Sequence, residues 1–182
     1  MTDRSVNEVK KRILEVALEV YTAKPPHEVT VDEIAKKAGV SKGLIFYHFK
    51  NKYNLEKEVM GLIYKMIFES LKGVGSVDEL LDRMCQNLLK LPNIVRFIAY
   101  LSGKVMVYGE YDYFKKAFDE AMEFVTPLFM KEDIADPKKV AIAIMALFDG
   151  LSIYSLFYDI GDVDDYKKIA LDLIKCRKKE EV

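Results

Sequence analysis

Apolar side chains recur along this chain with the period of an α-helix. Between Val6 and Val20, and again between Leu55 and Ile67, they return every three or four residues, which places them on one face of a helix. The strict alternation of apolar and polar residues that marks a half-buried strand is absent. The pattern therefore predicts an all-α fold of about nine helices.

Capping and turn residues mark where the predicted helices begin and end. Three capping boxes, in which a hydroxyl residue is followed three positions later by Glu, start helices at Ser5, Thr30 and Ser76. Asp136 followed by Pro137 predicts another start, because proline is favoured in the first turn of a helix. We place the other boundaries at Pro25-Pro26, before Pro92, and at Gly73, Gly75, Gly161 and Asp162.

One segment carries the most informative pattern. Thr30 and Glu33 open a short helix with an apolar stripe, and Gly39 supplies the left-handed residue that a tight turn between helices requires. Ser41 then caps a second helix of about two turns that ends before Phe49. A short helix that presents polar and aromatic side chains after such a turn is typical of the recognition helix of a helix-turn-helix.

The string Thr-Val-Asp-Glu-Ile-Ala-Lys-Lys-Ala-Gly-Val-Ser-Lys-Gly from Thr30, followed by Tyr-His-Phe-Lys-Asn-Lys at 47–52, resembles the N-terminal domain of the TetR family of transcriptional repressors. The resemblance covers residues from about 10 to 60. It implies a three-helix helix-turn-helix head over residues 1–53 and a helical ligand-binding and dimerisation body over residues 54–182. It further implies a homodimer on a palindromic operator of double-stranded DNA, released by a small-molecule effector.

Candidate DNA contacts follow from this arrangement. Lys42 lies one residue after the cap Ser41, at the helix end that points at base edges, so we assign it base readout, with an ordinary solvated lysine as the alternative. The resemblance implies phosphate contacts for Tyr47, His48 and Lys52, with a packed imidazole as the alternative for His48. The candidate DNA-binding residues are Thr30, Ser41, Lys42, Gly43, Leu44, Tyr47, His48 and Lys52.

Two positions depart from the usual pattern of that family. Leu44 stands where Thr or Ser commonly contacts a phosphate or a thymine methyl group, and Phe46 stands where Tyr commonly donates to a phosphate. Leu44 keeps the apolar contact, whereas Phe46 has no hydroxyl group to donate. The base preference of a relative therefore does not transfer to this chain.

The distribution of charge fits a basic head. Residues 1–53 contain 10 basic and 7 acidic side chains, and the remainder contains 18 and 22, for a net charge of −1 overall. A positive domain on an acidic remainder is suited to DNA binding by the head alone.

The body is unusually rich in aromatic and methionine side chains, which suit an adaptable apolar ligand cavity between helices. The alternative is a plain helical core, and Asp149 is either a polar anchor for the ligand or a hydrogen-bonding group in a subunit interface. The candidate ligand-binding residues are Tyr64, Phe68, Met84, Phe97, Tyr100, Met106, Phe114, Phe118, Met122 and Asp149.

The segment from Val140 to Tyr158 is apolar nearly all round, and the chain as a whole is 51% hydrophobic. Asp149, Ser152 and Ser155 interrupt the segment, so we interpret it as a buried interface helix rather than a membrane span. Its simplest partner is its own copy across a two-fold axis, beside the last helix. The candidate interface residues are Ile144, Phe148, Leu151, Ser155, Leu171 and Ile174.

The sequence shows no signature of an enzyme, a metal site or a cofactor site. His27 and His48 are the two histidines, and Cys85 and Cys176 lie far apart without metal-ligand spacing. We therefore expect no enzyme activity, no metal, no cofactor and no membrane association. With no leader-like start and a reducing pattern of cysteine use, the expected location is the cytoplasm. The alternatives to a ligand-responsive repressor are an effector-independent DNA-binding or adaptor protein and a small-molecule carrier or redox sensor.

Overall fold

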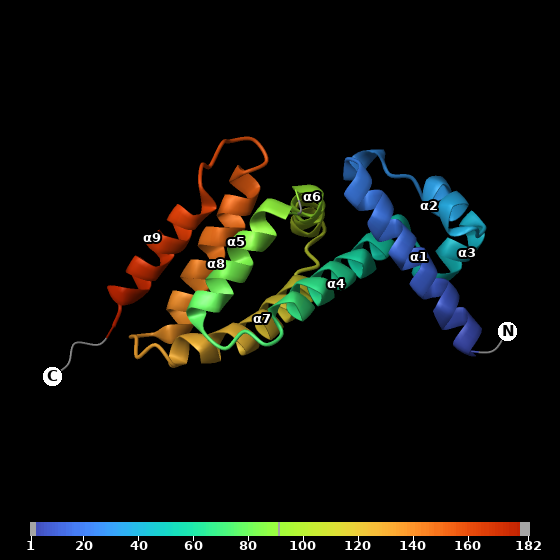
Figure 1. Cartoon of the computed structure of the whole chain (residues 1–182). Coiled ribbons are helices and arrows are strands. Elements are labelled where there is room, and N and C mark those ends of the chain that lie inside the picture. Colours follow the sequence, from blue (N-terminus) through green and yellow to red (C-terminus); the bar gives the residue numbers. More distant parts are fainter. Residues whose placement is uncertain (1–2, 91, 179–182) are drawn as a thin grey trace. The chain divides into compact units, whose positions relative to one another are not determined.

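The computed structural model describes residues 3–90 and 92–178, and within these ranges the chain folds into nine α-helices and one 3₁₀ turn. The all-α expectation is confirmed. In chain order the elements are α1 (Asp3–Ala23), η1 (Pro26–Glu28), α2 (Val31–Ala38), α3 (Lys42–Phe49), α4 (Lys52–Leu71), α5 (Val77–Lys90), α6 (Pro92–Tyr108), α7 (Asp112–Met130), α8 (Pro137–Tyr154) and α9 (Val163–Lys175) (Figure 1).

Most predicted caps form the expected hydrogen bonds. The backbone nitrogen of Glu33 donates to Thr30 Oγ1 over 3.2 Å, and that of Glu79 donates to Ser76 Oγ over 3.2 Å. Asp162 Oδ1 accepts from the backbone nitrogen of Asp164 at the start of α9. These bonds satisfy amide groups that the first turn of a helix leaves without an intrahelical partner.

Two predicted boundaries and one predicted cap are wrong. α1 begins at Asp3, two residues before the expected start at Ser5, so Ser5 lies inside the helix. Asp136 precedes α8 as expected, but its carboxylate makes no capping hydrogen bond and instead lies 3.3 Å from Lys139 Nζ. α8 ends at Tyr154, well before the expected stop at Gly161, because the chain leaves the helix through successive turns after Ser155.

The described residues form two compact units. The N-terminal unit consists of Met1–Ile67 and Asn93–Tyr108, and the C-terminal unit consists of Phe68–Pro92 and Gly109–Val182. α4 runs without a break past residue 53, where we expected the head to end, and most of it belongs to the N-terminal unit together with α6. The compact units therefore do not divide at residue 53. The functional boundary between a DNA-binding head and a ligand-binding body at that residue stays a prediction.

Each unit has its own apolar core. In the N-terminal unit α1, α2 and α3 pack together (Figure 1), and fully buried side chains such as Ile13, Ile34 and Ile45 fill the space between them. In the C-terminal unit α7 and α8 pack side by side, and α5 packs against α8 and α9. Leu81 and Phe129 lie in the core of that unit.

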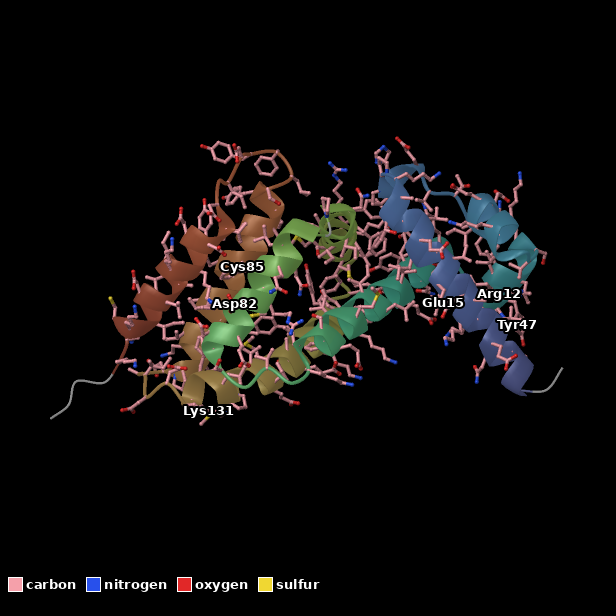
Figure 2. All side chains as sticks on the ribbon, viewed as in Figure 1. Arg12, Glu15, Tyr47, Asp82, Cys85 and Lys131 are labelled. Carbon is pink, nitrogen blue, oxygen red and sulfur yellow. The ribbon has the colours of Figure 1, made fainter. Side chains whose placement is uncertain are left out.

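Polar contacts add to the packing of the C-terminal unit. Lys167 of α9 lies 3.1 Å from Asp78 and 2.5 Å from Asp82 of α5. Lys131, at the end of α7, donates to the carbonyl oxygen of Gly75 over 3.2 Å. Figure 2 labels Asp82 on α5 and Lys131 at the end of α7.

Candidate DNA-binding surface

The two short helices α2 and α3 are held by complementary apolar faces. α2 buries Ile34 and Ala38, and α3 buries Ile45 and Phe49. Gly39 joins them in the left-handed conformation, with φ of 65°, as the sequence predicted. At this angle a side chain with Cβ is strained, so the turn depends on glycine. The result is a helix-turn-helix with its recognition helix anchored by only two buried residues.

The opposite side of α3 is open to solvent. Lys42 and Gly43 are exposed, Leu44 and His48 are half-buried, and Tyr47 keeps 65% of its surface exposed. Figure 2 labels Tyr47 on α3. The structure therefore gathers these five predicted residues on one short helix, and the half-buried state of His48 fits both its predicted contact and its alternative as a packed imidazole.

Thr30 and Ser41 also lie at the surface, but their hydroxyl oxygens already accept capping hydrogen bonds from Glu33 and Leu44. They can still donate a proton to a phosphate oxygen, since a hydroxyl group has both capacities. Phe46, which the sequence flagged for its missing hydroxyl, is at the surface as well. It offers DNA an apolar edge only.

Lys42 does not project freely. Its Nζ lies 2.8 Å from Asp32 Oδ2, and both side chains are about half exposed or more. The contact joins the first turn of α2 to the first turn of α3. Sequence reasoning missed it because the two residues are ten positions apart on different helices.

Lys52 has partners within the protein, and its predicted phosphate contact stays a prediction. Its Nζ donates to the carbonyl oxygen of Val29 over 2.5 Å and lies 3.7 Å from Glu56 Oε1. Desolvation by the surrounding protein lowers the pKa of Lys52. In this conformation the ammonium group connects α4 to the segment before α2. Because an ammonium group has three donors, the bond to Val29 leaves capacity for a phosphate contact.

Glu56 of α4 is the one charged side chain that the described residues bury completely. Its Oε1 accepts from Tyr21 over 3.0 Å and from Tyr100 over 3.2 Å, and its Oε2 accepts from Lys104 over 2.6 Å. Burial, followed by the charge of Glu56, raises the pKa of Tyr21. Desolvation alone would lower the pKa of Lys104, but the hydrogen bonds to Glu56 and Tyr100 raise it. No motif in the sequence pointed to this cluster.

The candidate ligand residues are divided between the two units. Phe97 is buried in the N-terminal core with its ring 4.7 Å from that of Tyr21, and Tyr100 belongs to the Glu56 cluster. Met122 is buried in the C-terminal core and Met84 packs against it, whereas Met106 and Phe118 are exposed. The half-buried candidates are Tyr64, Phe68 and Phe114.

Two shallow hollows on the surface of the described residues are lined mainly by charged side chains. One, of about 380 Å³, runs along α7 between Asp112 and Glu123, and the other, of about 300 Å³, lies between Lys72 and Gln86. Neither hollow is lined by a candidate ligand residue. An apolar effector site therefore stays a prediction.

The interface candidates lie mostly on the wrong side of their helices. Ile144, Phe148, Leu151 and Ile174 are buried within the core of their own chain, and Ser155 and Leu171 are partly buried. The open face of α8 and α9 is a different set. It consists of Ile142, Ala143, Ala146, Asp149, Ile153, Tyr154, Ile169 and Leu173.

Other expectations concern chemistry outside DNA binding. Cys85 is buried and lies 3.8 Å from the carbonyl oxygen of Val163, and Cys176 is exposed at the end of α9. Among the described residues, no group of three side chains is placed to hold a metal ion. Over the same residues, every helix is too short or too polar to cross a membrane.

Comparison with known proteins agrees with this geometry. Residues 13–59 match the family described as bacterial regulatory proteins, tetR family. The HTH-type transcriptional regulator SrpR of Pseudomonas putida is 37% identical over 59 residues, which are 32% of this chain and 28% of that protein. The N-terminal head of this chain therefore carries the DNA-binding domain of the TetR family of transcriptional regulators. The match to SrpR spans less than a third of that relative's length.

Solved structures extend the likeness of this chain to transcriptional regulators beyond the head. A transcriptional regulator from Rhodococcus sp. Rha1 superposes with a TM-score of 0.78 at 18% identity, covering 94% of this chain and 99% of that one. A protein from Saccharomonospora viridis, solved in complex with choline, has a TM-score of 0.70 at 25% identity and covers 93% and 96%. The body therefore has the same helical fold as these regulators, although its sequence has diverged.

Proposed function

We propose that this TetR-family regulator binds a palindromic DNA operator as a homodimer, represses transcription there, and is released by an apolar or amphipathic small molecule. The observation that carries DNA binding is the construction of α3. Ile45 and Phe49 anchor the helix, while Lys42, Gly43 and Tyr47 are exposed along a helix of the size that a major groove accepts.

The open face of α8 and α9 supports the homodimer. Ile142, Ile153, Ile169 and Leu173 are exposed apolar side chains, and Ala146 lies among them on α8. Contiguous exposed apolar residues mark interaction surfaces, and a second copy can cover them by a two-fold axis because the same patch serves both partners. α8 would then be buried on both faces, in keeping with its nearly continuous apolar sequence.

A dimer places two recognition helices on one duplex. Such a dimer binds two half-sites separated by about one helical turn or a multiple of it. Repression follows if the operator overlaps the site where transcription starts, since the bound dimer occupies the same groove and backbone. DNA binding then occurs on the chromosome, so we propose that the protein is located in the cytoplasm.

Selection of duplexes from a random pool tests DNA binding. The selected sequences should be palindromic, and their affinity, measured by fluorescence anisotropy, should fall steeply with salt because phosphate contacts release counterions. Lys42→Ala should cost about 1–3 kcal/mol on the selected duplex and relax the preference at one base pair. A pool that yields no common sequence, with Lys42→Ala behaving as the wild type, would contradict the proposal.

The effector is supported by two observations of different kinds. The aromatic and methionine content of the body suits an adaptable apolar site, and the Saccharomonospora viridis structure contains choline. Calorimetric titration of apolar and cationic amphipathic compounds, with and without the selected operator, tests it. A true effector should bind more weakly to the DNA complex by the factor with which it weakens DNA binding, typically equivalent to about 1–3 kcal/mol. If every compound binds both states equally, the protein is an effector-independent regulator.

A further inference from the structure

Glu56 accepts hydrogen bonds from three side chains on two other helices of the N-terminal unit. Tyr21 comes from α1, and Tyr100 and Lys104 come from α6, while Glu56 itself lies in the second turn of α4. α6 makes a further bond to α1, because Asn93 Nδ2 donates to the carbonyl oxygen of Thr22. The carboxylate is thus the point at which α1, α4 and α6 meet through polar contacts.

A buried carboxylate depends on all its partners. Taking the charge out of water is costly, and the loss of one partner leaves that cost without compensation. Glu56 has no exposed side-chain surface, so water cannot replace a missing donor. Each of the bonds from Tyr21, Tyr100 and Lys104 therefore constrains where α6 can lie against α1 and α4.

Lys52 connects this carboxylate to the helix-turn-helix. Its ammonium group is shared between Glu56, at 3.7 Å, and the carbonyl oxygen of Val29, at 2.5 Å. Val29 is buried and immediately precedes Thr30, the residue whose hydroxyl caps α2. The position of Lys52 consequently affects how the chain enters the helix-turn-helix.

We propose that Glu56 is a positioning residue for DNA binding, which acts through Lys52 on the Val29–Thr30 junction. In this arrangement Lys104 of α6 determines how strongly Glu56 attracts Lys52 away from Val29. Two ammonium groups share one carboxylate. While Lys104 neutralises Glu56 at 2.6 Å, Lys52 is left to hold Val29. When Lys104 is withdrawn, the unbalanced carboxylate attracts Lys52, and Val29 loses its donor. This inference rests on the proposed DNA-binding function.

The chain passes between the two units at three points, and two of them are the ends of α6, which carries Tyr100 and Lys104. The N-terminal unit continues into the C-terminal unit through α4 at Ile67 and through both ends of α6, at Asn93 and Tyr108. α6 is therefore joined to the C-terminal unit at both of its ends while it packs within the N-terminal unit. The Glu56 cluster would convert a displacement of α6 into a change at the start of α2.

The competition of Lys52 and Lys104 for the carboxylate of Glu56 can be measured through their pKa values. In protein labelled at the lysine Cε carbons, NMR titration reports the pKa of each side chain. Lys104→Met should raise the pKa of Lys52, because it removes a nearby cation and leaves Glu56 to Lys52 alone. Lys104→Arg keeps the charge and should leave the pKa of Lys52 near its wild-type value. Arg96→Met, which removes a cation of α6 that contacts Asn93, is the matched control.

The effect on the head has its own readout. The carbonyl carbon of Val29 should shift in Lys52→Met and also in Lys104→Met, because the hydrogen bond to Lys52 is lost or weakened in both. Arg96→Met should leave it unchanged. If Lys104→Met alters neither the pKa of Lys52 nor the Val29 carbonyl relative to Arg96→Met, the proposal is wrong. Urea unfolding of each variant identifies any that fail to fold, and Lys104→Arg then provides the comparison.

Operator affinity completes the test. Glu56→Gln and Lys52→Met should each weaken binding to the selected duplex by about fivefold or more, the lower end of coupling between separate sites. The double variant should bind no worse than Lys52→Met, since both act on one contact. Lys57→Met removes another lysine of α4, which lies over the ring of Tyr53, and should bind as the wild type.

The proposed DNA-binding function and the positioning role of Glu56 can be disproved separately. If the wild-type protein selects no duplex, the proposed function fails, and the NMR measurements then show whether the lysine balance exists in its absence. If DNA binds but Glu56→Gln leaves the affinity unchanged, the proposed function stands and the positioning role is wrong. Additive losses in the double variant would likewise overturn the link through Lys52.

Discussion

Lys42 Nζ of α3 lies 2.8 Å from Asp32 Oδ2 of α2. In the absence of DNA, the residue assigned to base readout is therefore paired with a carboxylate. Both side chains are exposed, and such pairs contribute only about 0–1 kcal/mol. The bond is therefore easily exchanged for a bond to DNA. Its more important effect is electrostatic, because Asp32 places a negative charge close to the surface that phosphates approach.

We expect Asp32→Asn to strengthen binding to unselected duplex DNA. Removing the carboxylate releases Lys42 and lowers repulsion of phosphates, and the gain should be about two- to fivefold, corresponding to a surface pair of up to about 1 kcal/mol. The ratio of selected to unselected affinity should fall. Glu15→Gln removes the same charge from α1, where Glu15 lies 3.7 Å from Lys11, and should leave that ratio unchanged. Equal behaviour of the two variants would contradict the role of Asp32.

Gly43→Ala should separate folding from DNA binding. Gly43 lies inside α3 with ordinary helical backbone, and an added Cβ would meet only Ser41 Oγ, at 3.8 Å. The substitution should therefore stabilise the fold by about 0.5–1 kcal/mol, while the methyl group hinders close approach to DNA and weakens operator binding.

Gly39→Ala is the companion variant. Its φ of 65° strains any residue with Cβ, so urea unfolding should show a loss of about 1 kcal/mol. Equal effects of alanine at the two positions on the free energy of unfolding would show that the turn does not have this geometry.

Leu173→Glu and Ala146→Glu should dissociate the proposed homodimer without unfolding it. Both residues lie on the open face of α8 and α9, and an unpaired charge in the interface should cost about 3 kcal/mol or more. Light scattering should report monomers with unchanged circular dichroism. Ile144→Glu should instead unfold the C-terminal unit, because Ile144 is buried in the core of its own chain. Gln86→Glu, on the exposed side of α5, is the control and should remain dimeric.

Acid should remove a specific contribution of Glu33 to stability. The hydrogen bond from Lys24, over 2.5 Å, and that from the backbone of Thr30 hold the pKa of Glu33 below its ordinary range. A carboxylate with a lowered folded-state pKa stabilises the fold above its unfolded pKa of about 4.3. That stability is lost as the pH falls through the folded value.

The comparison with Glu33→Gln measures this effect. The wild type should be more stable than Glu33→Gln in urea at neutral pH, and the difference should close on acidification below pH of about 4. In a Lys24→Met background the difference at neutral pH should be smaller, because the main cause of the lowered pKa is gone. A difference that persists at low pH would indicate another cause.

Features whose partners lie within one turn were predictable from the sequence. Thr30 with Glu33, Ser76 with Glu79, and the left-handed Gly39 all form as expected. Each depends on atoms no more than four residues apart, so local chemistry is sufficient. Asp136 is an exception at the same short range: its backbone is left-handed, with φ of 53°, and its carboxylate pairs with Lys139 instead of capping α8.

The inward face of α8 could not be predicted from the sequence. Ile142 and Ile144 are equally apolar, yet Ile144 is buried in the chain and Ile142 is at the surface. A helix that is apolar nearly all round has no periodic pattern to orient it. The packing of α5 and α7 against α8 determines which side of α8 is buried. The residues of α8 that we propose for the interface therefore lie on its opposite, exposed side.

By itself the sequence determined an all-α chain with a helix-turn-helix head, because hydrophobic period, caps and one obligatory glycine are local properties. Only the tertiary structure decided where Lys52 points and what surrounds Glu56. Tyr21, Tyr100 and Lys104 reach that carboxylate from positions 35, 44 and 48 residues away, and no spacing rule connects residues so distant. Their meeting depends on how α1 and α6 dock on α4, which is settled by packing of the whole unit rather than by any one helix.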